Sequence, residues 1–418
     1  MVKRRKTMSI LLPEERLLKI PKLYKHELNL DLNHITNVEE VVKREMRKAF
    51  AVKPIKSGMK VAVAVGSRGI ENILSIVNTI IEEIKDNGGN PFIVGAMGSH
   101  GTGSEEGQRQ VLDKLGINEE NLKVPVITEP QVVRIGELED GTVVYFSRAA
   151  YEADMIIPVN RIKPHTDFDG KKSVESGICK MIVMGLGNRK GCVSVHSAGI
   201  EKFPAIIIEA AEMLLKKTKI GFGIGIVENA IGKTVHVESI SRQTLPYREV
   251  ELLNYAKEKM AKLPFTKIDI LIIDEIGKDI SGSGADPNII GRLGPKKYSK
   301  DVPQISYIII LGITERSNGN ATGIGFADII TKDVFNAINM ETTYTNCLAG
   351  GSRFGLECAK IPPVAEDETE AIQLALKMWK GNPEKCKIVR IKNTKELETI
   401  YISKNLKDCI AKEGGKDE

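Results

Sequence analysis

Short apolar runs alternate with amphipathic stretches along the first part of the chain. Residues 59–66 (MKVAVAVG) are apolar almost throughout, which predicts a buried parallel strand. In residues 70–89, apolar side chains recur three and four positions apart before a Gly-Gly pair, which predicts an amphipathic helix that ends there. Strand-like runs follow at 90–100 and 154–159, with a helix over roughly 205–217. The pattern predicts an α/β fold with a doubly wound, mainly parallel sheet.

A second series of such runs indicates a second domain. It begins at Lys267 with IDILIIDEIG, and QISYIIILGIT at 304–314 has the same character. A chain of 418 residues also exceeds what one ordinary hydrophobic core holds. We therefore expect two α/β domains with mainly parallel sheets. The first would span residues 1–262 and the second residues 263–418, with an active site in the cleft between them.

Composition narrows the classes of function. Lys and Arg number 60 against 55 Asp and Glu, aromatic residues make up 5%, and there is one tryptophan. The small excess of +5 and the scarcity of aromatic residues argue against a nucleic-acid platform. The opening MVKRRK is followed by a proline and two glutamates, which is not a signal peptide, and no apolar run could cross a bilayer. We expect a cytoplasmic protein with no membrane partner. The six cysteines form no C-x-x-C pair, which argues against a zinc ribbon or an iron–sulfur cluster.

Four predicted strands end in glycine or a turn next to a side chain that could take part in catalysis or binding. These endings carry Arg68 (VGSRG), His100 (GAMGSH), His165 (NRIKPH) and Lys278 (DEIGK). Each alone is more often an ordinary surface or loop residue. In doubly wound sheets, however, ligands bind at the carboxyl ends of strands, so four such endings predict one site. Histidines exchange protons near neutral pH, and the two cations suit a small anionic substrate. The chain contains neither a G-x-S-x-G nor an H-E-x-x-H motif, so these signs of a hydrolase are missing.

The segment SVESGICKMIVMGLGNRKGCVSVHS contains a lysine in unusual surroundings. Lys180 is flanked by apolar residues, and His196 lies near the end of the same segment. One interpretation is an aliphatic stem that lies along apolar surface with its ammonium group in water. The other is a partly desolvated amine that can form a covalent link.

These motifs resemble the nickel-dependent lactate racemase family, the hydroxyacid racemases and epimerases. The resemblance covers nearly the whole chain and is closest to the branch with N-R-I-K-P-H-T-D-F and S-G-x-x-K-M motifs. Its residues here are NRIKPHTDF, SGICKM, GLGNRKG, GAMGSHG and GKDISGSGADPNIIGR.

The resemblance implies a nickel pincer nucleotide, a pyridinium-3-thioamide-5-thiocarboxylic acid mononucleotide that holds nickel. Family members attach it to a lysine through a thioamide. Lys180 would carry it here, because its spacing to His196 fits the family, and Lys172 in DGKKS is the second candidate. His196 would be the nickel ligand, and nitrogen and sulfur donors do suit nickel.

The same resemblance implies roles for the strand-end residues. His100 and His165 would be the two acid/base groups, one for each enantiomer, and Arg68 and Lys278 would bind the substrate carboxylate. Lactate-specific members begin the first block with Asp-x-Thr-Arg where this chain reads VGSRG, which affects substrate contacts.

The expected reaction is inversion at C2 of a 2-hydroxy acid by hydride transfer to the cofactor, because the C2–H bond beside a carboxylate is barely acidic. The polar groups of KPHTDFDGKK favour a larger polyhydroxy acid such as an aldonate over lactate. The expected partners are this anionic substrate and the enzymes that make the cofactor.

Two other interpretations stay open at this point. One is a lyase or dehydratase, cofactor-free or with a simple divalent metal, that uses His100 and His165, with Asp167, Asp169 and Glu175 as oxygen ligands. The other is a non-enzymatic cofactor carrier or ligand sensor with the same cleft.

Overall fold

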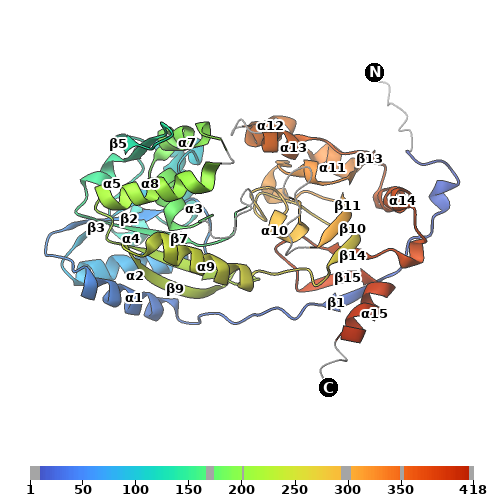
Figure 1. Cartoon of the computed structure of the whole chain (residues 1–418), viewed down its shortest axis with the longest axis horizontal. Helices are drawn as coiled ribbons and strands as arrows, with labels where there is room; N and C mark the ends of the chain where they lie inside the picture. Colours follow the sequence, from blue (N-terminus) through green and yellow to red (C-terminus); the bar gives the residue numbers. More distant parts are fainter. Residues whose placement is uncertain (1–9, 166–173, 200–201, 293–302, 349–352, 414–418) are drawn as a thin grey trace. The chain divides into compact units, whose positions relative to one another are not determined.

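The computed structural model describes residues 10–165, 174–199, 202–292, 303–348 and 353–413. The chain divides into two compact units. Unit 1 contains residues 1–30 and 261–418, and unit 2 contains residues 31–260. Figure 1 shows each unit as a sheet with helices around it.

Unit 2 is built on a six-stranded sheet of order β4-β3-β2-β7-β8-β9. All neighbours are parallel except β8 and β9, which are antiparallel. The strands are β2 (Lys60–Val65), β3 (Asn90–Gly95), β4 (Val126–Ile127), β7 (Met155–Arg161), β8 (Phe222–Glu228) and β9 (Thr234–Ser241). A separate antiparallel hairpin consists of β5 (Val132–Glu137) and β6 (Val143–Ser147).

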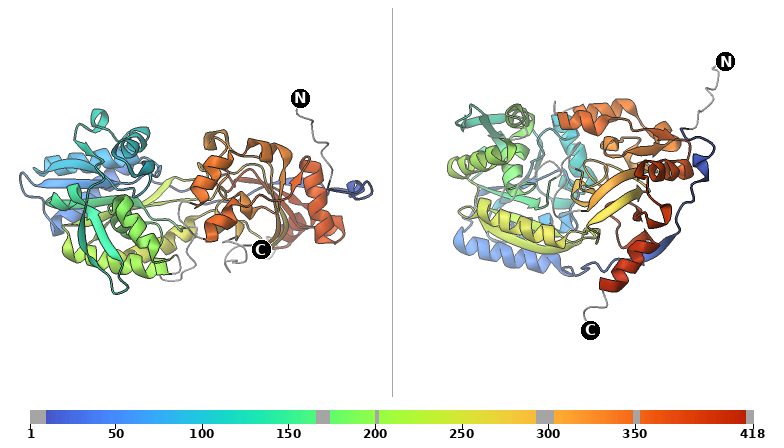
Figure 2. Two further views of the ribbon diagram at one scale, coloured as in Figure 1. Left: turned by 90° about the horizontal axis from the view of Figure 1, so that it is seen from above. Right: turned by 45° about the vertical axis from the view of Figure 1, so that its right-hand side comes forward.

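Helices cover both faces of this sheet (Figure 2). One face packs against α1 (Val38–Val52), α2 (Ile73–Asp86), α3 (Glu105–Lys114) and α4 (Glu119–Leu122). The other packs against α5 (Arg148–Glu152), α6 (Ile178–Lys180), the π-helical turn Met181–Gly185, α7 (Asn188–Ser197), α8 (Phe203–Lys217) and α9 (Leu245–Lys259). Alternate residues of β2 enter the two cores, since successive side chains of a strand point to opposite faces.

Unit 1 has a seven-stranded mixed sheet of order β1-β15-β14-β10-β11-β12-β13. Its strands are β1 (Leu23–Glu27), β10 (Lys267–Ile273), β11 (Gln304–Ile310), β12 (Ile329–Thr331), β13 (Val364–Ala365), β14 (Ile388–Ile391) and β15 (Thr399–Ser403). Its helices are α10 (Pro287–Ile290), α11 (Lys332–Ala337), α12 (Met340–Leu348), α13 (Arg353–Ala359), α14 (Glu368–Trp379) and α15 (Lys404–Glu413). The predicted fold class, two α/β domains with mainly parallel sheets, is confirmed.

The division of the chain differs from the expected one at its start. The prediction placed residues 1–262 together, but β1 pairs in antiparallel register with β15, from Leu23 opposite Ser403 to Glu27 opposite Thr399. The segment Met1–Leu30 therefore belongs to unit 1. At the other end, unit 2 finishes at Met260, just before the expected boundary.

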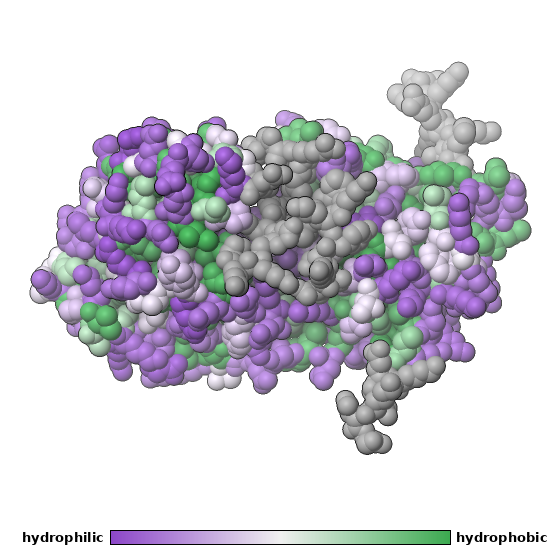
Figure 3. Space-filling view, viewed as in Figure 1, coloured by the Kyte–Doolittle hydropathy of each residue, from purple (hydrophilic) through white to green (hydrophobic). Residues whose placement is uncertain are grey.

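On the face shown in Figure 3, hydrophilic side chains predominate and hydrophobic ones are scattered among them. Within the described ranges, no helix is both long enough and apolar enough to cross a membrane.

Candidate active site

Three adjacent parallel strands of unit 2 bring the predicted strand-end residues together. Arg68 follows β2, His100 follows β3 and His165 follows β7, and the sheet order places β2 between the other two. A pocket of about 320 Å³ lies at these carboxyl ends. Its lining includes Ser67, Arg68, Ser99, His100, Asn160, His165, Ser176, Lys180, Cys192, His196 and Phe203. Five of the seven predicted site residues thus share one pocket, formed within unit 2.

The two remaining predicted residues are not among the described residues that line this pocket. Lys278 belongs to unit 1, where its ammonium group donates to the carbonyl oxygen of Gly282 at 2.7 Å. Lys172 falls outside the described residues. Their predicted roles therefore stay predictions.

His100 is oriented by a residue that the sequence reasoning did not single out. Its Nδ1 lies 2.5 Å from the hydroxyl oxygen of Ser67, which follows β2. A hydrogen bond at one ring nitrogen selects the tautomer and the orientation of an imidazole. Ser67 lies in the VGSRG motif, next to Arg68, and this position in the sequence could have identified it as a site residue.

His165 is held through its backbone. Its N–H donates to a carboxylate oxygen of Glu175 at 2.7 Å, and Glu175 also accepts from the ammonium group of Lys257 at 2.6 Å. Burial raises the pKa of Glu175, although both hydrogen bonds oppose that shift. Burial, followed by the positive charges of Lys180 and Arg68, holds the pKa of His165 well below its usual range. At neutral pH the imidazole of His165 is therefore neutral and able to accept a proton.

Lys180 and His196 meet at one aromatic ring. The Lys180 Nζ lies 6.0 Å from the ring centroid of Phe203, and the His196 ring centroid lies 5.0 Å from it. Burial of the imidazole and then the charge of Lys180 lower the pKa of His196. The neutral imidazole that results is the form that ligates metals. Phe203 was not predicted, because an apolar residue at a helix start carries no sign of a site.

The backbone around Lys180 is irregular in a way that is common at functional sites. Lys180 ends the single turn of α6, and the π-helical turn Met181–Gly185 follows directly. Short π-helical turns are found frequently where side chains have to be placed for function.

A buried carboxylate supports this turn. Glu249 of α9 is 1% exposed and accepts the N–H of Cys179 at 2.9 Å. Burial raises the pKa of Glu249 from its ordinary value of 4.5 to about 7, against the effect of the backbone hydrogen bonds. A Cβ on Gly177 would lie 2.5 Å from the other oxygen of this carboxylate, so only glycine fits there. Glu249 is far from Cys179 in the chain, and no local pattern pointed to it.

Arg68 is the cation of the pocket that suits an anionic ligand. Burial and then the neighbouring guanidinium of Arg161 lower its pKa, while Arg161 itself pairs with Glu228. The side chain of Arg68 still reaches solvent, and its planar guanidinium can bind a carboxylate through two parallel hydrogen bonds in a defined orientation.

The described residues do not assemble a metal site from protein ligands alone. Among them, no group of three or more His, Cys, Asp and Glu side chains could hold a metal ion. Of the three carboxylates considered for a simple metal, Glu175 is engaged by His165 and Lys257, while Asp167 and Asp169 lie outside the described residues.

Comparison with known proteins gives a match to one family model and several similar solved structures, of which two follow. Residues 4–203 match the family model described as the lactate racemase N-terminal domain. The lactate racemase apoprotein from Thermoanaerobacterium thermosaccharolyticum is similar over 94% of this chain and 97% of its own, with a TM-score of 0.55 and 15% identity. A Thermotoga maritima protein of known crystal structure is similar over 65% of this chain and 70% of its own, with a TM-score of 0.49 and 15% identity. No curated protein sequence matches the chain. At so low an identity, the likeness to the lactate racemase apoprotein shows a common fold.

Proposed function

We propose that this chain is a member of the lactate racemase family and inverts C2 of a 2-hydroxy acid. The observation that carries the proposal is the single pocket in which His100, His165, Lys180 and His196 meet at the carboxyl ends of three parallel strands. The family match at residues 4–203 covers all four of these residues.

The pocket fits the cofactor that the family implies. A volume of about 320 Å³ is in the range of small-molecule sites. Lys180 supplies an amine for the thioamide link and His196 a neutral nitrogen donor, both beside Phe203. A metal held mainly by the nucleotide needs few protein ligands, which agrees with the absence of a three-ligand cluster among the described residues. When bound, this group supplies the capacity to accept and return a hydride.

The protein's own residues perform the remaining chemistry. The guanidinium of Arg68 binds the substrate carboxylate and so fixes the direction in which C2 faces. His165, neutral at pH 7, takes the hydroxyl proton of one enantiomer, and His100, oriented by Ser67, serves the other. Lys278 of unit 1 is proposed to bind the same carboxylate together with Arg68, as predicted from the sequence. We favour a polyhydroxy acid over lactate as substrate, on the polar groups of the KPHTDFDGKK segment.

The first experiment is intact mass and metal content of the protein co-produced with the cofactor-making enzymes, followed by peptide mapping. A nucleotide-sized adduct on Lys180, lost in Lys180→Ala and retained in Lys190→Ala, supports the proposal. Lys190 is a suitable control because it lies on the next helix, 4.6 Å from the ring of Tyr145. An adduct on Lys172 would move the attachment point and keep the family. A protein with neither adduct nor nickel, from cells that load a known family member, would refute the assignment and leave the simple-metal lyase.

A second experiment tests the route of the hydrogen at C2. In heavy water, inversion by hydride transfer leaves the original hydrogen on C2, which mass spectrometry of the product detects. Incorporation of solvent deuterium at C2 would show proton abstraction and exclude this mechanism.

A further inference from the structure

A second cavity lies between α1 and β9, at the edge of the six-stranded sheet. This α1–β9 groove has a volume of about 820 Å³, against about 320 Å³ for the active-site pocket. None of the described residues that line one cavity lines the other. The groove reaches Phe222, the first residue of β8, whereas the active-site pocket lies at the carboxyl ends of the strands. The groove is therefore a separate feature of unit 2.

The middle of the groove is apolar. Phe222 and Val237 are buried, 2% and 3% exposed, and Ala49 of α1 lines the groove with them. Val52, in the last turn of α1, also lines the groove and is 76% exposed. An exposed branched apolar side chain in a groove with these apolar residues provides surface that a ligand's hydrocarbon would remove from water.

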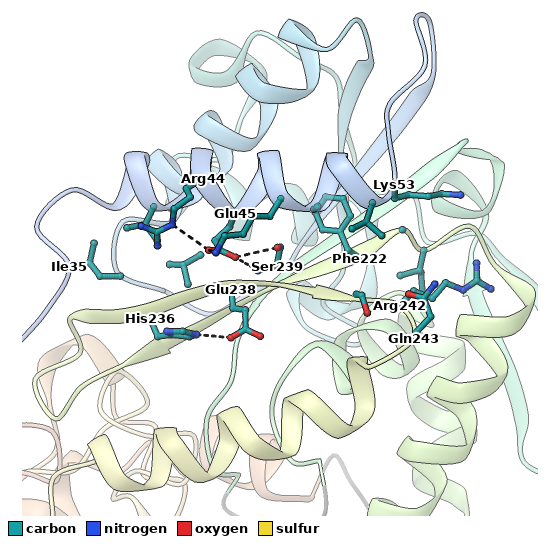
Figure 4. A pocket seen from close by; sticks show the side chains of 18 of the residues that line it. Ile35, Arg44, Glu45, Lys53, Phe222, His236, Glu238, Ser239, Arg242 and Gln243 are labelled. Carbon is teal, nitrogen blue, oxygen red and sulfur yellow. Dashed lines mark hydrogen bonds and ion pairs between the residues drawn. The ribbon is translucent and has the colours of Figure 1, made fainter.

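Toward one end of the groove the charged side chains are paired, the cations of Arg44 and Lys48 with the one carboxylate of Glu45. Glu45, 5% exposed, accepts from Lys48 at 2.7 Å and lies 3.6 Å from Arg44 (Figure 4). Hydrogen bonds from Lys48 and from Ser239 lower the pKa of Glu45 despite its burial, so it is ionised at neutral pH. A ligand at this end meets groups that already have partners.

The opposite end carries positive charge that is not paired in this way. Figure 4 shows Lys53, Arg242 and Gln243 together at this end, where α1 and β9 both finish. In the described part of the chain, neither Lys53 nor Arg242 forms an ion pair, and Arg242 donates to the carbonyl oxygen of Lys216 at 3.3 Å. The groove thus has an apolar middle and one cationic end.

The outer edge of β9, which pairs with no further strand among the described residues, cannot readily accept an added strand. The N–H of Ser239 donates to the Glu45 carboxylate at 3.2 Å, and the N–H of Ile35 donates to the carbonyl oxygen of Thr234 at 2.8 Å. An extended peptide would need these edge groups for its own hydrogen bonds, and a buried charge beside an edge strand discourages such pairing. The geometry favours a small molecule over a peptide.

We propose that the α1–β9 groove binds a small amphiphilic organic anion, with its apolar body between α1 and β9 and its carboxylate or phosphate at Lys53 and Arg242. Lys53 follows α1 and Arg242 follows β9, and both line the groove, so a head group at this end has a cation on each side. Arginine and lysine are the usual partners of both head groups.

The test is isothermal titration calorimetry of the full chain with octanoate and with octyl phosphate, each below its micelle concentration. Octyl glucoside serves as the neutral probe. We expect one site per chain with a Kd on the order of 1 mM or tighter, and the head group that binds more tightly identifies the natural one. Lys53→Gln combined with Arg242→Gln should weaken binding at least tenfold. Arg47→Gln, on the same helix and paired with Glu83 outside the groove, should leave it unchanged.

A second variant tests the apolar part independently. Ala49→Phe fills the groove and should abolish binding while the two cations remain. Circular dichroism melting establishes that each variant is folded. If Ala49→Phe does not fold, the double variant of Lys53 and Arg242 tests the proposal by itself. Failure of both anions to bind, equal binding of octyl glucoside, or binding unchanged by the double variant would overturn the proposal.

Discussion

Replacement of Glu249 by glutamine should change how stability depends on pH. This carboxyl group is 1% exposed, beside the turn that carries Lys180, and its pKa in the folded protein is about 7 against an ordinary value of 4.5. Between these values the folded protein binds a proton that the unfolded chain releases. Stability due to Glu249 is therefore fully present below pH 4.5 and falls as pH rises to about 7, above which the loss is constant.

The size of the effect follows from the shift in pKa. One pKa unit corresponds to about 1.4 kcal/mol, so ionisation of Glu249 costs the folded state about 3 kcal/mol above pH 7. About 2.5 kcal/mol of this loss develops between pH 5 and pH 8. Glu249→Gln cannot ionise and keeps an oxygen to accept the Cys179 N–H. Relative to the native protein, the variant should therefore gain about 2.5 kcal/mol on going from pH 5 to pH 8.

Urea unfolding at pH 5 and pH 8, followed by far-ultraviolet circular dichroism, measures this difference. The only tryptophan, Trp379, is in α14 of unit 1, so its fluorescence follows the unit that does not contain Glu249. If the circular dichroism signal shows a transition that the tryptophan fluorescence does not, that transition is the unfolding of unit 2. Glu258→Gln removes the same charge from an exposed position of the same helix, where no ion pair forms within the described residues, and reports the effect of net charge. If Glu249→Gln and the native protein lose stability in parallel between pH 5 and pH 8, the proton uptake does not belong to Glu249.

Three further substitutions test the site and its packing. Ser67→Ala removes the hydrogen bond to His100 Nδ1 and should lower kcat about tenfold while leaving the metal content unchanged; an unaltered kcat in a racemisation assay would show that the bond does not orient the base. Gly98→Ala should destabilise the protein by about 2 kcal/mol, because φ is +63° and the new Cβ would lie 2.5 Å from the Cys192 Sγ; thermal melting checks this, and a native melting temperature would contradict it. Glu175→Gln leaves Lys257 without its charged partner and should lower the free energy of unfolding in urea at pH 7 by about 2 kcal/mol. A variant as stable as the native protein would contradict this.

Local patterns in the sequence were sufficient for the elements that position the site. The apolar run at 59–66 became β2, the amphipathic stretch at 70–89 became α2, and DMIIPV became the start of β7. Such elements follow from the residue types themselves, since a run buried on both faces and a face repeating every three to four residues are visible in a short window. The endings of these strands then indicated Arg68 and His165.

The contacts between distant segments were decided by the tertiary structure alone. Phe203 lies beside Lys180 because α8 packs near α6, and Glu249 of α9 reaches Cys179 from a distant part of the chain. Because β1 pairs with β15, the segment Met1–Leu30 belongs to unit 1 and not to the predicted N-terminal domain. A short window of sequence carries the periodicity of one element and nothing of its partner. The supporting residues of the site and the α1–β9 groove exist only once helices and strands have packed.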